Sequence, residues 1–326
     1  MSINKTDKFT LSVVIPTMNR RDHLKNALES LLQQSVPPKE IIVVDSSGNS
    51  ETKTLVSQEH QVFFEKGISL KYIWESAKGM NYARNVGALA SSGNIVLIMD
   101  DDTIVDKHYV REILKVFKNI PCAVGVQGYC LPPTAWRHNS TRVNFVNVFR
   151  SAFFLNHMEK NKQHVLPSGE VAAVYPLNKI IEASIIYATS AFKREVLLQN
   201  PLDDKLVGYS WGDEYFTLKM SQSYPHCLFV TPFAKLYHDK APYGRPIGKP
   251  FYYITAAYEL YNFDINLCPS VRNWIAFFWK WLGKAIQALT YLPSKDSRMS
   301  LIYTFESFFW AFGNLEKVRN ARFNLQ

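Results

Sequence analysis

Short apolar runs alternate with segments of helical periodicity over the first third of the chain. Runs of four to six apolar residues are typical of buried strands, whereas apolar residues three and four positions apart indicate the buried face of a helix. The runs that predict strands are Leu11–Ile15, Ile41–Val44, Leu70–Trp74 and Ile95–Met99. The intervening periodicity predicts helices around Leu24–Leu32, Glu51–Gln58, Asn81–Ala90 and Val110–Phe117, with Asn19 as the N-cap of the first.

This alternation predicts an α/β fold with a mostly parallel central sheet that helices cover on both faces. In such sheets, ligands bind outside the carboxyl ends of the strands. Three polar segments follow predicted strands directly, namely Thr17–Asn19, Asp45–Gly48 and Asp100–Asp102. We therefore expect these segments to converge at one edge of the sheet and to form a binding site there.

The pattern is less regular in the middle of the chain and changes again near the C-terminus. We expect strands at Ala123–Cys130, Ile180–Ala188, Cys227–Val230 and Ala234–Tyr237, and helices at Arg142–Lys162 and Trp211–Ser221. Two apolar stripes at helical spacing, from Trp274 to Leu289 and from Leu301 to Phe312, predict C-terminal amphipathic helices.

The charge of the chain is unevenly distributed. The net charge is +9, and the segment from Pro269 to Gln326 has eight Lys/Arg against three Asp/Glu. A basic tail rich in aromatic residues indicates an anionic partner, either a lipid surface or a nucleic acid. Because no nucleic-acid-binding motif is present, we expect a peripheral membrane contact and no nucleic-acid partner. The alternative is that both stripes pack on the catalytic domain.

Several features bear on the location of the protein. The segment Met1–Thr10 is polar and lacks the apolar core of a signal peptide. No apolar run approaches the ~20 residues of a spanning helix. The four cysteines are widely spaced and include no C-x-x-C pair, which argues against a zinc site. We expect a cytoplasmic protein at the inner face of the cell membrane.

Three adjacent carboxylates close the fourth predicted strand. Asp100, Asp101 and Asp102 repel one another unless a cation or solvent neutralises them. Oxygen ligands of this kind suit Mg²⁺ or Mn²⁺. The alternative is an acidic turn that caps the next helix. Asp45 ends another strand, where a carboxylate can either bind a ribose or base, or simply form a turn.

Four segments are similar to the signatures of inverting glycosyltransferase family 2, of the kind that assembles bacterial surface polysaccharides. They occur in the family's order within about residues 11–103, and their conjunction is more specific than any one of them. The segments are Val13-Val14-Ile15-Pro16-Thr17-x-Asn19-Arg20, Ile42-Val43-Val44-Asp45-x-Ser47, Gly79-x-Asn81-x-Ala83-Arg84-Asn85-x-Gly87, and Ser92-Gly93-x-Ile95 followed by Asp100-Asp101-Asp102.

The resemblance implies a GT-A fold and a role for each matching residue. Pro16, Thr17, Asn19 and Asp45 would hold the nucleoside of the donor. Arg84 would lie near the donor diphosphate, and Asp100 and Asp101 would contact the donor. Asp102, with Asp100 and His238, would bind the Mg²⁺ or Mn²⁺ ion. His238 qualifies because many relatives have a metal-binding histidine after a late strand.

A further similarity concerns the general base. The segment Gly208-Tyr-Ser-Trp-Gly-Asp-Glu214 resembles the family's Gly-Glu-Asp acceptor motif, with its two acids in reversed order. An inverting transfer needs a carboxylate to take the proton of the acceptor hydroxyl. Glu214 and Asp213 are both candidates. Alternatively, both are present because the first turn of a helix favours acids.

The resemblance and the patterns together predict a glycosyltransferase. It would move a sugar from a nucleoside diphosphate sugar, with UDP expected, to a glycan or lipid-linked glycan. We expect a catalytic domain over residues 1–250, with a donor half at about 9–130 and an acceptor half at about 131–250, and a helical region over 251–326. The alternatives are a nucleotidyltransferase, which the absence of glycine in Pro16–Arg20 disfavours, and a non-catalytic binding protein of the same fold.

Overall fold

The computed structural model describes most of the chain. The described residues are 9–76, 79–131, 148–155, 157–159, 162–174, 177–187, 189–204, 212–239, 247–267, 269–289 and 295–320. The chain forms two compact units. The first comprises Met1–Pro132, Leu177–Val207 and Met220–Ala241, and the second comprises Pro133–Pro176, Gly208–Lys219 and Pro242–Gln326. The division into a catalytic domain and a tail near residue 250 stays a prediction.

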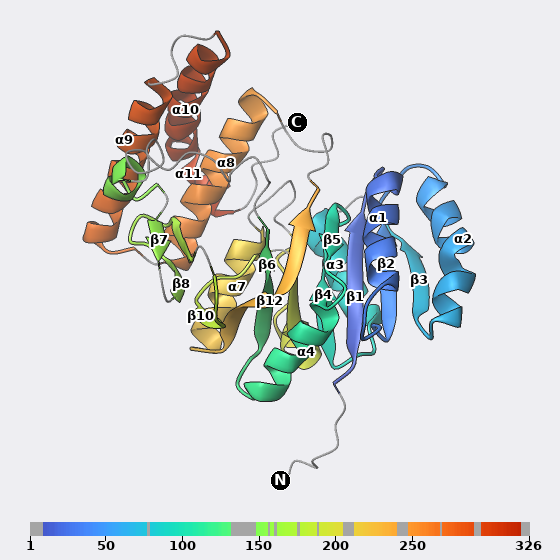
Figure 1. The fold of residues 1–326 in the computed structure, drawn as a ribbon. Coiled ribbons are helices and arrows are strands. Elements are labelled where there is room, and N and C mark those ends of the chain that lie inside the picture. The colour runs from blue at the N-terminus through green and yellow to red at the C-terminus, as the bar shows by residue number, and fades with distance from the viewer. Residues whose placement is uncertain are drawn as a thin grey trace. The chain divides into compact units, whose positions relative to one another are not determined.

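A mixed, mostly parallel sheet forms the centre of the first unit, as predicted (Figure 1). Its strands lie in the order β3-β2-β1-β4-β11-β6-β12-β10. The strands β3, β2, β1 and β4 are parallel, and β11 runs antiparallel between β4 and β6. Their bounds are β1 Leu11–Thr17, β2 Glu40–Asp45, β3 Ser69–Trp74, β4 Ile95–Ile98, β6 Gly125–Cys130, β10 Ile181–Ala183, β11 Ser190–Lys193 and β12 Leu228–His238.

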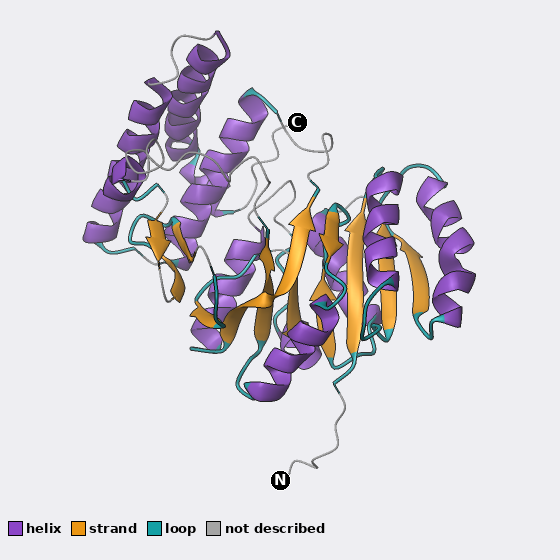
Figure 2. Cartoon of the chain, in the orientation of Figure 1, coloured by secondary structure: helices purple, strands orange, loops and turns teal. Residues whose placement is uncertain are grey.

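Helices cover both faces of this sheet because its parallel strands are apolar on both sides. The helices α1 (Arg21–Leu32), α2 (Glu51–Glu65) and α4 (Tyr109–Asn119) form one core cluster with Val13, Ile15 and their neighbours. The helix α3 (Met80–Ala90) packs on the face that carries Val14. A Cβ at Gly87 would lie 2.2 Å from Cγ1 of Val14, so only glycine permits this approach. Figure 2 shows the helices and the sheet as separate layers.

A buried carboxylate ties three elements together at the amino ends of these strands. Glu40 accepts hydrogen bonds from the Ser12 hydroxyl (2.6 Å), from the backbone N–H and hydroxyl of Ser92 (2.6 and 2.7 Å), and from Lys71 (2.6 Å). Burial alone would raise the pKa of Glu40, but these donors lower it to about 2. The Ser92-Gly93 part of the family signature therefore has a structural role here, since Gly93 also donates its N–H to Ser12.

The second unit contains a small sheet and the C-terminal helices. The strands β7 (His157–Glu159) and β8 (Lys162–Val165) flank β9 (Val171–Val174). The helices are α8 (Lys249–Tyr261), α9 (Val271–Leu289), α10 (Lys295–Gly313) and α11 (Leu315–Arg319), with a π-helical turn, η2, at Asn262–Asn266. The two predicted stripes meet in an aromatic core, where Phe277 lies 4.4 Å from Phe263 and Trp281 lies 4.9 Å from Phe308, centroid to centroid.

Several sequence predictions of local structure are wrong. Arg142–Lys162 is not one helix, because His157–Glu159 and Lys162 belong to strands. Within Ile180–Ala188, only Ile181–Ala183 pairs as a strand. The two strands expected on either side of residues 231–233 form the single strand β12. Asn19 does not cap α1; it has a left-handed backbone (φ 55°), and Arg20 occupies the N-cap position.

Candidate functional site

The aspartate run forms a tight turn at the carboxyl end of β4, as the sequence predicts. The backbone N–H of Thr103 donates to the carbonyl of Asp100 (3.2 Å), and the chain then enters the short strand β5 (Thr103–Val105). This turn directs the three carboxylates differently. The side chain of Asp100 is 21% exposed, whereas those of Asp101 and Asp102 are almost fully buried. The three acids are therefore expected to have different functions.

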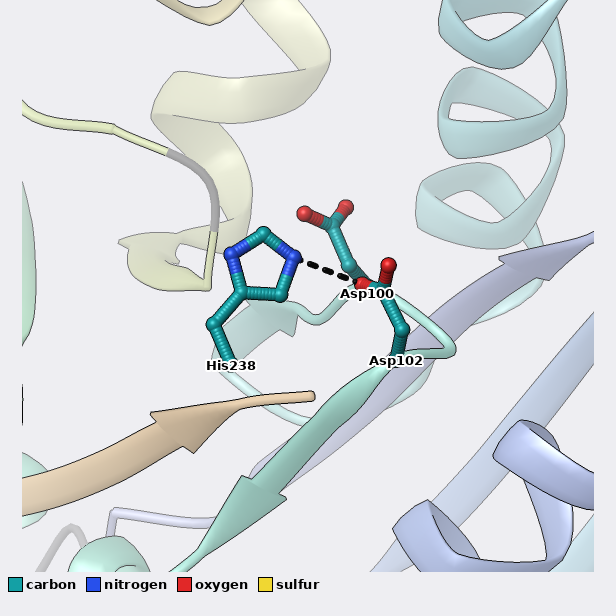
Figure 3. A group of neighbouring side chains, drawn as sticks. All are labelled: Asp100, Asp102 and His238. Atoms are coloured by element: carbon teal, nitrogen blue, oxygen red, sulfur yellow. Dashed lines mark hydrogen bonds and ion pairs between the residues drawn. The ribbon is translucent and has the colours of Figure 1, made fainter. Parts of the chain in front are cut away.

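Strand pairing brings His238 to this turn from 136 residues away. The end of β12 pairs antiparallel with β5, and His238 lies opposite Thr103. The histidine Nε2 is 2.8 Å from Oδ1 of Asp102 (Figure 3). The backbone N–H of Asp239 also donates to the carbonyl of Asp102 (2.8 Å). The register of β5 with β12 thus fixes the position of the histidine.

The ligand atoms of Asp100, Asp102 and His238 fit a divalent cation. They lie within 4.8 Å of one another. Figure 3 shows the three side chains together at the end of the strands. Carboxylates suit Mg²⁺ and Mn²⁺, while an imidazole nitrogen suits first-row transition metals. The mixed donor set therefore suits a divalent cation of either kind. A cation between Asp102 and His238 would replace the hydrogen bond that now joins them.

A buried arginine holds the first carboxylate of the run. Arg84 in α3 is only 1% exposed, and its Nη2 lies 3.0 Å from Oδ1 of Asp100. Its Nη1 lies 3.5 Å from the Asn81 side chain. The Asn81 amide donates in turn to the carbonyl of Asp203 (2.9 Å). Arg84 therefore orients Asp100 in this structure, and its contact with a donor diphosphate stays a prediction.

Asp101 joins the β4 turn to the loop after β1. Its carboxylate accepts from the Thr17 hydroxyl (2.8 Å) and from Arg20 (3.0 Å). Burial raises the pKa of Asp101 to about 6, against the opposing effects of Arg20 and Thr17. Arg20 also lies 3.7 Å from Asp102. Arg20 belongs to a family motif but had no predicted role, because its position beside Asp101 and Asp102 appears only in the structure.

The loop after β2 is organised around Ser47. Its backbone N–H donates to Asp45 (2.9 Å), and its hydroxyl accepts from the N–H of Asn19 (2.7 Å). Asp45 is fully buried and also accepts from the Tyr72 hydroxyl (2.9 Å). Burial and the Asp45 carboxylate raise the pKa of Tyr72 to about 12, so its hydroxyl stays protonated and can donate. The structure thus brings Thr17, Asn19 and Asp45 to one edge, as expected, with Pro16 beside Thr17 in β1.

The two candidate bases lie at the start of α7 (Gly212–Ser223), in the second unit. The preceding residues of the motif, Gly208–Trp211, lie outside the described residues. Burial raises the pKa of Glu214 well above its usual value, and the charges of Glu170, Asp213 and Glu259 raise it further. Lys280 acts in the opposite direction. Tyr215 packs on Tyr261 with centroids 5.5 Å apart, which fixes this end of α7 against α8.

The charges that surround Glu214 form a buried ionic cluster. Lys280 of α9 lies 3.1 Å from Glu259 and 3.7 Å from Glu170, and Lys284 contacts the same two acids. Although burial alone raises it, Lys280 and Lys284 lower the pKa of Glu259 to about 2. Sequence reasoning missed this cluster, because both lysines lie on the buried side of a helix whose stripe was identified from apolar residues alone.

A mixed β-sheet covered by helices, with carboxylates and a histidine at its carboxyl edge, is the arrangement of a GT-A fold. The sequence model of the family described as glycosyl transferase family 2 matches residues 12–175, which is half of the chain. The chain therefore belongs to glycosyl transferase family 2, as the sequence signatures predicted.

Known relatives match only a part of the chain. A putative teichuronic acid biosynthesis glycosyltransferase, TuaG of Bacillus subtilis, is 29% identical over 121 residues, which cover 37% of this chain and 47% of that protein. The chain thus spans less than half the length of this relative.

Two solved structures share the fold over almost the whole chain. A mannosyltransferase from Pyrobaculum calidifontis, solved with GDP-Man and Mn²⁺, has a TM-score of 0.56 at 16% identity and covers 97% of this chain and 86% of its own. TarS residues 1–349 of S. aureus, solved with UDP-GlcNAc, has a TM-score of 0.53 at 14% identity, with 96% and 88% covered. At these identities the similarity demonstrates the fold alone.

Proposed function

We propose that this protein transfers a sugar from a nucleoside diphosphate sugar to a hydroxyl of a glycan or lipid-linked glycan, with inversion and with the aid of a divalent cation. The observation that carries the proposal is the Asp100–Asp102–His238 cluster at the carboxyl edge of the sheet. When bound there, a cation neutralises the negative charge that develops on the departing diphosphate. A UDP-sugar and Mn²⁺ are the donor and ion that we test first; one neighbour of the same fold was solved with UDP-GlcNAc, and another with GDP-Man and Mn²⁺.

In the proposed reaction, the residues of the chain bind the donor, orient the reacting groups and accept a proton. The edge formed by Thr17, Asn19 and Asp45 holds the nucleoside, and Arg84 orients Asp100. The acceptor oxygen attacks the anomeric carbon from the side opposite the diphosphate. As the new bond forms, Glu214 takes the hydroxyl proton and the bond to the diphosphate oxygen breaks. Burial and the neighbouring acids raise the pKa of Glu214, and a raised pKa makes its carboxylate a stronger proton acceptor.

A thermal-shift screen tests the donor proposal. A ligand that binds only the folded protein stabilises it by about 2.7 kcal/mol at a concentration of 100 Kd. For a chain of this size, we expect a UDP-sugar to raise Tm by several degrees in the presence of Mn²⁺ and by much less with EDTA. GDP-, CDP- and ADP-sugars serve as matched comparisons. If none of the nucleotide sugars raises Tm with Mn²⁺, the proposed donor class is wrong.

We further propose that the second unit attaches to a membrane surface. The helices α9 and α10 each expose large apolar side chains three to four positions apart, including Val271 (78% exposed) and Ile275 (66%) on α9 and Phe309 (67%) on α10. Exposed apolar surface of this extent marks an interaction site. The net charge of +9 of the whole chain favours an anionic lipid surface as the partner. Among the described residues, no helix is both long and apolar enough to cross a bilayer.

Replacing three of the exposed apolar residues of α9 and α10 tests the membrane proposal. We expect Ile275→Ser, Leu282→Ser and Phe309→Ser together to weaken binding to anionic phospholipid vesicles roughly 100-fold, at about 1 kcal/mol for each side chain partly removed from water. Co-sedimentation with vesicles measures the binding. Phe64→Ser, which removes an equally exposed aromatic (68%) from α2, is the matched control. Equal binding by the triple variant and the wild type would remove the proposal.

A further inference from the structure

An exposed tryptophan lies at the carboxyl edge of the sheet, beside the predicted nucleoside site. Trp74 is the last residue of β3 and pairs in register with Asp45, the last residue of β2. The backbone N–H of Glu75 also donates to the carbonyl of Asp45 (2.9 Å). The Trp74 side chain is nevertheless 59% exposed. An aromatic ring thus stands in solvent next to a carboxylate that is fully buried.

The position of this ring is fixed by a hydrogen bond. The indole Nε1–H of Trp74 donates to the carbonyl oxygen of Ser47 (3.2 Å). Ser47 is held in turn by Asp45 through its N–H and by Asn19 through its hydroxyl. The tryptophan is therefore tied to the loops after β1 and β2. A ring that is already oriented loses little conformational entropy when a ligand binds to its face.

The chemistry of the surrounding groups suits a nucleobase. A nucleobase presents a flat aromatic face and polar edges, and an exposed indole can stack on the face of any base. The Asp45 oxygens accept from Ser47 and Tyr72. Because Asp45 is fully buried, it acts by holding Ser47, to which the Trp74 ring is bonded.

We propose that Trp74 is the surface on which the nucleobase of the donor stacks, so that this residue supplies affinity for the nucleoside half of the nucleotide sugar. The inference rests on the proposed function, since it assumes a nucleoside diphosphate donor. The sequence analysis identified Trp74 only as the end of a strand. An indole can stack on any base, so Trp74 sets the affinity for the nucleotide. The polar groups around Asp45 discriminate between bases.

Calorimetric titration of the full-length protein with two ligands tests this inference. The ligands are UDP with Mn²⁺, which has a base, and pyrophosphate with Mn²⁺, which has none. Because base–aromatic stacking is worth about 1–3 kcal/mol, we expect Trp74→Ala to bind UDP roughly 5- to 150-fold more weakly. Pyrophosphate binding should not change. Trp74→Phe, which keeps an aromatic face, should retain most of the affinity for UDP.

The same inference predicts a kinetic signature. A contact with the base is equal in the ground state and the transition state, so Trp74→Ala should raise the KM for the donor and leave kcat nearly unchanged. Phe64→Ala, which removes an exposed aromatic near the end of α2, is the matched control and should change neither constant. Because Trp74 is largely exposed, its replacement should alter Tm little.

The outcomes separate this inference from the proposed function. If Trp74→Ala binds UDP with Mn²⁺ as tightly as the wild type does, the stacking role is overturned and the proposed function stays intact. An equal loss of affinity for UDP and for pyrophosphate in Trp74→Ala would also overturn it. The substitution would then have disturbed the whole binding site and not a contact with the base alone. If the wild type binds neither UDP nor GDP in the presence of Mn²⁺, the proposed function fails and the inference fails with it.

Discussion

Replacement of Asp102 by asparagine is expected to lower the rate of sugar transfer by about 100- to 1000-fold, the usual effect of removing one preorganised group that stabilises charge in an active site. Asp102 is nearly fully buried, contacts His238 at 2.8 Å and lies 3.7 Å from Arg20. Asparagine keeps the size of the side chain but removes the charge that would hold the cation. Excess Mn²⁺ should therefore restore little of the activity.

Release of UDP from a UDP-sugar, with and without acceptor, measures this effect. Asp106→Asn is the matched control, because Asp106 follows β5 but is exposed and accepts only from the His108 N–H among the bonds identified for its side chain. The control should retain the wild-type rate. Activity of Asp102→Asn that equals that of the wild type would contradict the role of this carboxylate.

Replacement of Glu214 by glutamine is expected to lower kcat by about 10²–10⁴-fold, the usual contribution of a general base. Glutamine has nearly the same shape but cannot accept the acceptor's proton. Donor binding should change little, because the lost function belongs to the transfer step. Isothermal titration with UDP and Mn²⁺ measures donor binding, and steady-state rates measure the transfer step, so the two experiments together distinguish a loss of binding from a loss of catalysis. If Asp213→Asn abolishes transfer and Glu214→Gln does not, Asp213 is the base.

The pH dependence of kcat tests the same assignment. Glu214 must be deprotonated to act as a base, and its pKa in the folded protein is raised, so activity should be lost as pH falls, at a higher pH than for an ordinary carboxyl. Glu170 is one of the charges that raise this pKa. Glu170→Gln should therefore move the acidic limb to lower pH. An acidic limb that stays in place in this variant would contradict the assignment of the limb to Glu214.

The first four strands and the edge that they form could be predicted from the sequence because their signals are local. The strands β1 and β2 are buried on both faces and read as unbroken apolar runs. The loops that follow parallel strands converge wherever the strands themselves lie side by side. The meeting of Thr17, Asn19 and Asp45 at one edge is confirmed for this reason.

The rest of the site depends on long-range pairing that no local pattern encodes. His238 reaches Asp102 only because β12 pairs with the three-residue strand β5, which the sequence analysis did not predict. The family resemblance supplied His238 where periodicity could not. Asn19 has the residue type of an N-cap, but its backbone N–H bonds to Ser47, and this tertiary contact prevails over the local preference.

The second unit was the least predictable part of the chain. The stripes of α9 and α10 are confirmed as helices, since their apolar residues recur at helical spacing. The pairing of Lys280 and Lys284 with Glu259 and Glu170 was not foreseeable, because charged residues on a helix are normally exposed. The predicted helix Arg142–Lys162 wrongly included β7 and the first residue of β8, since these strands have only three and four residues and a mixed composition.

The central claim is that Asp100, Asp102 and His238 hold a divalent cation beside a nucleoside diphosphate. Crystals of the full chain with UDP and MnCl₂, measured at the manganese absorption edge, test it directly. We expect one anomalous peak at Asp100, Asp102 and His238, beside the diphosphate of UDP. Clear density for UDP with no anomalous peak at these side chains, or with the peak at other residues, would contradict it.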